Sequence, residues 1–78
     1  MDDIHENDLV VLLVDKPDVE LYRGDVGTVV QVFELTADHP AGFIIEFVNE
    51  TGNVRAEIDI TDRSQIVKLR LKLDLVAA

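Results

Sequence analysis

The longest apolar run in this sequence is the six residues Leu9-Val10-Val11-Leu12-Leu13-Val14, and its length narrows the possible folds. A membrane-spanning helix needs about 20 consecutive apolar residues, so this run does not form one. Its length and β-branched content are typical of a buried β-strand. A central strand cannot continue through Pro17, because proline has no amide hydrogen and a fixed φ. We therefore predict a first, buried strand over residues 9–15.

β-Branched and aromatic residues dominate the other apolar stretches, and glycine and proline separate them, which is typical of short strands. We predict further strands over about 28–35, 43–49 and 54–60, and a last strand that begins near Ile66. The 43–49 strand is expected to place three residues on one inward face: Phe43, Ile45 and Phe47. The 54–60 strand shows the clearest alternation, with inward Val54, Ala56, Ile58 and Ile60 and outward Arg55, Glu57 and Asp59.

The long connection over residues 16–25 contains three large side chains, Val19, Leu21 and Tyr22, which predict that it folds back on the domain. Two glycines near its end, Gly24 and Gly27, are expected to supply the positive φ angles that a tight turn needs.

Two shorter connections carry turn-forming residues at 36–42 and at 50–53. Residues 61–65 are predicted to form a single helical turn, with Thr61 or Asp62 as its N-cap.

These elements predict an all-β domain, a small five-stranded SH3-like barrel over residues 8–70 with one short helical turn before the last strand. An oligonucleotide-binding-type barrel fits less well, since it has longer strands and inserts a helix where this chain has only four residues, 50–53. We predict an acidic N-terminal segment over residues 1–7 and an extension of the last strand over residues 71–78.

The composition excludes several classes of protein. Sixteen acidic residues against seven basic ones give a net charge of −9, which disfavours a general binder of phosphate backbones. A hydrophobic content of 47% separates the chain from a disordered acidic tail. It has no cysteine, hence no disulfide, thiolate metal site or thiol nucleophile. The acidic opening is unlike a secretory signal, so the expected location is cytoplasmic and no membrane partner is expected.

The sequence offers few residues that could act in catalysis. Ser64 is the only serine, and neither histidine lies near it in the sequence. A closed barrel of this size fills its interior with side chains and leaves no pocket that separates the pKa values of two carboxyl groups. The stretch His5-Glu6-Asn7-Asp8 offers metal ligands, but we interpret it as a frayed, solvated terminus. We therefore expect no catalytic residue, metal or cofactor.

The charge is unevenly distributed. Residues 63–72 carry Arg63, Lys68, Arg70 and Lys72 without an acid, whereas residues 1–62 sum to −12. In the last strand the leucines at 69, 71, 73 and 75 alternate with Lys68, Arg70, Lys72 and Asp74, which predicts an apolar face and a mostly basic face. One interpretation is a solvated basic face beside acidic strands. The other is that the strand outruns the barrel and pairs with a second copy or a partner chain.

One segment carries a family resemblance. Gly24-Asp25-Val26-Gly27-Thr28-Val29-Val30-Gln31-Val32, together with Asp8–Leu12, Ile45–Val48 with Thr51-Gly52, and Gln65–Leu69, resembles a bacterial family, domain of unknown function 4926, over roughly residues 7–70. The resemblance implies an SH3-like barrel and assigns no catalytic residue. The glycine segment also resembles, more loosely, the KOW-type turn of ribosomal and transcription barrels.

The function expected from these observations is that of a non-catalytic protein-interaction module, acting on a protein partner or a second copy through the C-terminal strand. The candidate partner-binding residues are Tyr22, Arg23, Asp25, Arg63, Lys68, Arg70 and Lys72. An alternative is an acidic immunity or antitoxin protein that neutralises a basic toxin. A second alternative is nucleic-acid binding through the KOW-like turn and a basic strip from Arg63 to Lys72, which the net charge disfavours.

Overall fold

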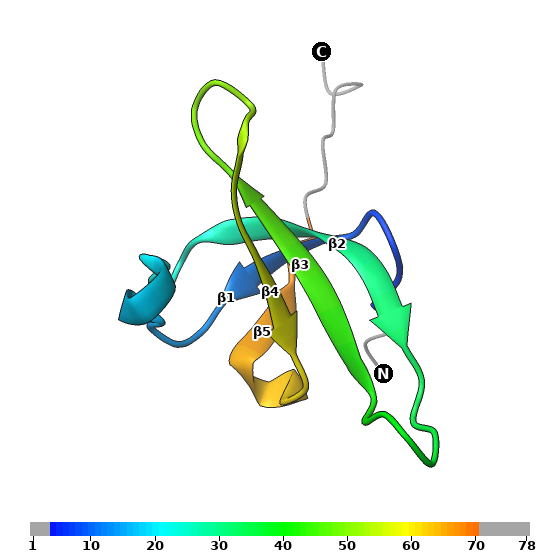
Figure 1. The fold of residues 1–78 in the computed structure, drawn as a ribbon. Helices are drawn as coiled ribbons and strands as arrows, with labels where there is room; N and C mark the ends of the chain where they lie inside the picture. The colour runs from blue at the N-terminus through cyan, green and yellow to red at the C-terminus, as the bar shows by residue number, and fades with distance from the viewer. Residues whose placement is uncertain (1–3, 71–78) are drawn as a thin grey trace.

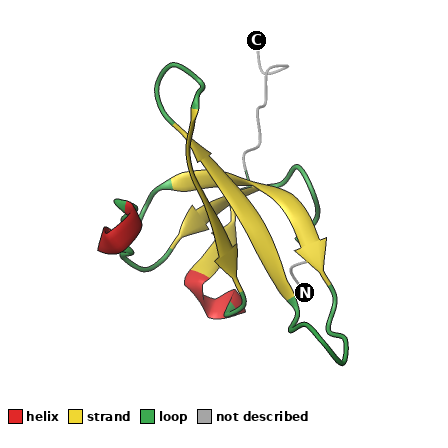
Figure 2. Cartoon of the chain, viewed as in Figure 1, coloured by secondary structure: helices red, strands yellow, loops and turns green. Residues whose placement is uncertain are grey.

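The computed structural model describes residues 4–70 of the chain, and its regular elements are strands and single helical turns (Figures 1 and 2). The strands are β1 (Leu9–Leu12), β2 (Val26–Phe33), β3 (Gly42–Val48), β4 (Val54–Ile60) and β5 (Ile66–Lys68). Two 3-10 turns, η1 (Pro17–Val19) and η2 (Arg63–Gln65), precede β2 and β5. The predicted all-β class and the five strands are confirmed.

The strands form one antiparallel sheet in the order β4-β3-β2-β1-β5. Strands β1 to β4 follow one another as a meander, and β5 returns to pair with β1. The register of β2 against β3 shifts between Val29 and Gln31, as at a β-bulge, and such a shift bends a strand. β2 curves strongly at this level of the sheet (Figure 1).

The core lies on the concave side of this sheet and contains one or more residues from each strand. Its buried members are Ile4, Val10, Leu12, Leu21, Val29, Ile45, Phe47, Ile60 and Ile66. Phe43 packs against them from β3, so the predicted inward face of that strand is confirmed.

The apolar run that begins at Leu9 differs from its prediction. The strand ends at Leu12 instead of residue 15, and only Val10 and Leu12 in it are fully buried. Leu9 and Leu13 are exposed by 39% and 37%, because side chains alternate across a strand and only one side of β1 faces the core.

The loop between β1 and β2 folds back on the domain, as predicted. Leu21 is fully buried, and its backbone forms two hydrogen bonds with Lys16, of 2.7 and 3.1 Å. These bonds close the short turn that contains η1, an element the sequence did not predict.

The two glycines at the end of this loop serve different purposes. Gly24 has a φ of +99°, as predicted. The prediction of a positive φ at Gly27 is wrong, because Gly27 is a buried β2 residue with ordinary backbone. A Cβ at Gly27 would lie 2.6 Å from Ile45 Cγ2 and 2.9 Å from Phe47 Cε1, so close packing requires glycine here.

The predicted alternation of β4 holds from Ala56 to Ile60. Val54, expected to face inward, is 59% exposed. The register between β3 and β4 shifts between Phe47 and Val48, and Val54 pairs with Val48 beyond that shift. A bulge of this kind reverses the side to which the residues beyond it point, so Val54 lies on the opposite side of the sheet from Ala56.

The helical turn before the last strand is confirmed. The Asp62 carboxylate caps η2 by accepting the Ser64 N–H at 3.0 Å and the Ser64 hydroxyl at 2.6 Å. β5 begins at Ile66, as predicted. The predicted extension over residues 71–78 lies outside the described residues.

The described part of the N-terminal segment is attached to the sheet. Ile4 is buried, the Asn7 N–H donates to the Val29 carbonyl at 2.7 Å, and the Val29 N–H donates to the Asp8 carbonyl at 2.9 Å. The stretch His5–Asp8 is therefore not frayed as the sequence indicated, although His5, Glu6 and Asn7 are exposed to solvent.

Candidate interaction surface

The loop residues predicted to contact a partner lie at the end of the β1–β2 loop. Tyr22 is 48% exposed, and its N–H donates to the Asp25 carboxylate at 2.8 Å. The Arg23 N–H donates to the Asp15 carboxylate, also at 2.8 Å. The carboxylate of Asp25 therefore fixes the turn, while the Tyr22 ring and the Arg23 side chain are exposed.

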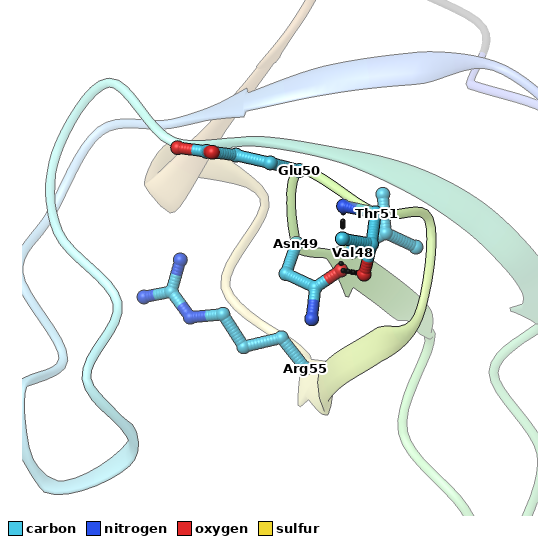
Figure 3. A pocket seen from close by; sticks show the side chains of 5 residues that line it. All are labelled: Val48, Asn49, Glu50, Thr51 and Arg55. Atoms are coloured by element: carbon cyan, nitrogen blue, oxygen red, sulfur yellow. Dashed lines mark hydrogen bonds between the residues drawn. The ribbon is translucent and has the colours of Figure 1, made fainter.

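Arg55 of β4 connects this loop to the β3–β4 hairpin. Its Nη2 donates to the Glu20 carbonyl and lies 4.0 Å from the Asp25 carboxylate. Figure 3 shows Arg55 at an open pocket beside the hairpin turn, which the Asn49 side chain holds by accepting hydrogen bonds from Thr51. Every residue that lines this pocket is exposed, so it has no buried polar group to orient a ligand: Val48, Asn49, Glu50, Thr51 and Arg55.

The predicted basic strip is located around η2 and β5. The Arg63 Nη1 donates to the Ile66 carbonyl at 2.7 Å, and the Lys68 Nζ lies 3.2 Å from the Asp8 carboxylate. Both groups make contacts within the chain, which reduces what they offer a nucleic-acid phosphate. Arg70 is exposed just beyond β5, and Lys72 lies outside the described residues.

Asp8 joins the N-terminal segment to β5, and its pKa is lowered from the usual value of 3.8. The main cause is the hydrogen bond from the His5 backbone N–H at 2.8 Å; burial opposes it, and Lys68 adds to the lowering. A carboxyl group whose pKa is lower in the folded chain stabilises that chain above the unfolded pKa. This contribution disappears as the pH falls through the folded value.

We expect wild type to lose stability relative to Asp8→Asn as the pH falls below about 3.8, because the variant has no carboxylate to protonate. Urea denaturation of both proteins across the acid range measures this difference. Lys68→Gln should change the acid limb less than Asp8→Asn does, since the His5 N–H is the larger cause. Parallel acid limbs for wild type and Asp8→Asn would contradict the assignment.

The convex side of β1, β2 and β5 carries an apolar surface that the sequence analysis did not identify. Val11 of β1 lies directly opposite Val26 of β2 and Val67 of β5, and directly opposed residues point to the same side. Leu9 and Leu13 lie two residues to either side of Val11. Val26 is 46% exposed and Val67 is 39% exposed. We call these five residues, Leu9, Val11, Leu13, Val26 and Val67, the outer apolar face.

The same convex side becomes acidic toward β4. Leu9 lies opposite Thr28, Thr28 opposite Glu46, and Glu46 opposite Glu57, so one row crosses four strands from apolar to acidic. Asp59 follows on β4, two residues from Glu57 and opposite Ile44. We call Glu46, Glu57 and Asp59 the acidic margin.

Residues 4–70 contain no group of three or more His, Asp or Glu side chains placed to hold a metal ion. The two helices in this part of the chain are single turns, too short to cross a membrane. What the surface offers chemically is apolar contact bordered by negative charge.

The fold and this surface define a small all-β domain built on a single five-stranded antiparallel sheet. The chain belongs to the family described as Domain of unknown function (DUF4926), whose family model matches residues 6–67. The resemblance drawn from the Gly24–Val32 segment is thereby confirmed. Comparison with curated proteins and with solved structures gave no match.

Proposed function

We propose that this chain is a non-catalytic SH3-like barrel that acts as a protein-interaction module and binds its partner through the outer apolar face. Support for the barrel comes from the strand order β4-β3-β2-β1-β5, the long loop before β2 and the 3-10 turn before β5. Closing a bent sheet of five strands in this way removes edge strands that could otherwise pair with other chains.

The observation that carries the proposed function is the alignment of Val11, Val26 and Val67 across three neighbouring strands, with Leu9 and Leu13 beside them. Isolated exposed apolar residues are common on soluble proteins, but a contiguous apolar patch marks an interaction site. The proposed contact surface thus moves from the Tyr22 loop and the basic strip to the convex side of the sheet.

Val26→Thr/Val67→Thr is expected to reduce partner binding about tenfold, because it replaces two exposed methyl groups of the face with hydroxyls. Threonine retains the β-branched shape that suits a strand, so the fold should be kept. Tagged wild-type and variant chains are incubated with extract of the producing cells, and the retained proteins are quantified by mass spectrometry.

Leu35→Thr is the matched control, since Leu35 is 76% exposed but lies beyond the end of β2, off the face. A partner retained by wild type and by the control, and lost from the double variant, supports the proposal. Equal retention by all three proteins, or no retention by wild type, contradicts it.

A further inference from the structure

We propose that the partner of the outer apolar face is a basic polypeptide, whose lysine or arginine side chains meet the acidic margin while its apolar residues cover the valines. This inference rests on the proposed function and names the chemistry of the partner. It follows from the order of side chains along the convex side of the sheet.

The first argument is the continuity of the apolar and acidic regions. The row Leu9, Thr28, Glu46, Glu57 is fixed by three registered strand pairs, so its apolar and acidic ends belong to one surface. Neighbouring strands lie about 5 Å apart, which places the acidic margin within reach of any polypeptide seated on the valines. A partner that covers the face and continues along this row meets Glu46 two strands from Leu9, and then Glu57.

The second argument is that the acidic margin is unfavourable within the chain itself. Glu46 and Glu57 are directly opposite on adjacent strands, and like charges in that position destabilise a sheet. Arg55, the residue of β4 at the register shift between Val54 and Ala56, directs its Nη2 to Glu20 and Asp25 instead of the acidic margin. Cationic side chains of a partner would relieve this repulsion, whereas a neutral partner would cover the two carboxylates and leave their charges uncompensated.

The third argument concerns a second copy as the occupant. Two copies that joined through the same face would each bring a net charge of −9, so bulk repulsion opposes their association. Like-charge contact disfavours an interface, whereas opposite charge both steers encounter and selects the partner. The charge therefore favours a basic partner over self-association. Among the alternatives drawn from the sequence, this inference favours the immunity or antitoxin interpretation.

A defined probe tests the inference. A fluorescent synthetic peptide with a valine-rich half and a lysine-rich half matches the row from Leu9 to Glu57, and a second peptide replaces each lysine with glutamate. Fluorescence anisotropy at low salt is expected to show binding of the lysine peptide at least tenfold tighter than that of the glutamate peptide. Added salt should weaken the binding.

The variants separate this surface from bulk charge. Glu46→Gln/Glu57→Gln is expected to weaken binding of the lysine peptide by about tenfold. Asp18→Asn/Asp38→Asn changes the net charge by the same amount, at exposed residues of η1 and of the β2–β3 connection. This control variant should weaken binding of the lysine peptide less than about twofold. Equal effects of the two double variants, or equal binding of the two peptides, would overturn the inference.

Two further measurements distinguish failure of this inference from failure of the proposed function. If Val26→Thr/Val67→Thr weakens binding of the lysine peptide but Glu46→Gln/Glu57→Gln does not, the outer apolar face binds a partner and the proposed basic chemistry of that partner is wrong. If neither variant has an effect, both proposals fail. A dimer of the wild-type chain in light scattering, lost in Val26→Thr/Val67→Thr, would identify a second copy as the occupant and overturn the basic partner.

Discussion

Replacing Leu21 with alanine is expected to lower the free energy of unfolding by about 2–5 kcal/mol. Leu21 is the one fully buried side chain of the β1–β2 loop within the described residues, and it belongs to the core. Truncating this side chain leaves a cavity in the core, and the hydrogen-bonded strands around it cannot move enough to fill that cavity. Urea denaturation followed by circular dichroism measures the loss.

Val19→Ala is the matched control in the same loop, because Val19 is 39% exposed and lies just two residues earlier. Its expected cost is below about 1 kcal/mol, since only part of its surface leaves water on folding. Similar costs for the two variants would show that Leu21 does not anchor the loop to the core.

Gly27→Ala is expected to destabilise the chain by about 1–3 kcal/mol, the usual cost of forcing an extra carbon into a packed interior. The new Cβ would lie 2.6 Å from Ile45 Cγ2 and 2.9 Å from the Phe47 ring. Both of these side chains are buried and cannot swing into water. Thermal and urea denaturation against wild type measure the effect.

A double-mutant cycle tests the cause. Ile45→Ala removes the nearest contacting atom, so Gly27→Ala should cost less in that background than in wild type. An unchanged cost would mean that backbone entropy or strand propensity, and not this close contact, makes glycine necessary at position 27.

Features that depend on neighbouring residues in the sequence were predicted well. The Asp62 cap, the start of β5 at Ile66 and the span of β4 follow from capping chemistry and from an alternation visible within one strand. Leu21 was placed correctly because a large apolar side chain in a polar loop is most stable when it is buried in the core.

Features that depend on the pairing of distant segments were not predicted. Val54 faces outward because of a register shift against β3, and Gly27 is required by two side chains that follow it by 18 and 20 residues. Ile4 is buried because the N-terminal segment pairs with β2. None of these contacts is encoded in a local pattern, so periodicity and turn chemistry do not reveal them.

The candidate surface also combines residues that local sequence predicted with residues that only the pairing of distant strands brings together. Tyr22, Arg23 and Asp25 were correctly placed on the loop, although the structure gives the Asp25 carboxylate a role in the turn. The outer apolar face unites Val11, Val26 and Val67 from three strands, and their alignment is visible only when both registers are known. The one signal in the sequence was the run from Leu9 to Val14, which is apolar on both sides of its strand.

The outer apolar face also bears on the fate of newly made chains. The chain by itself exposes the valines of this face, and such patches promote aggregation and recognition by chaperones and proteases. The net charge of −9 counters this hazard by keeping copies apart in solution. Under the proposed function, copies without a partner should be short-lived, and the abundance of the chain in the cell should follow the supply of the polypeptide that covers the face.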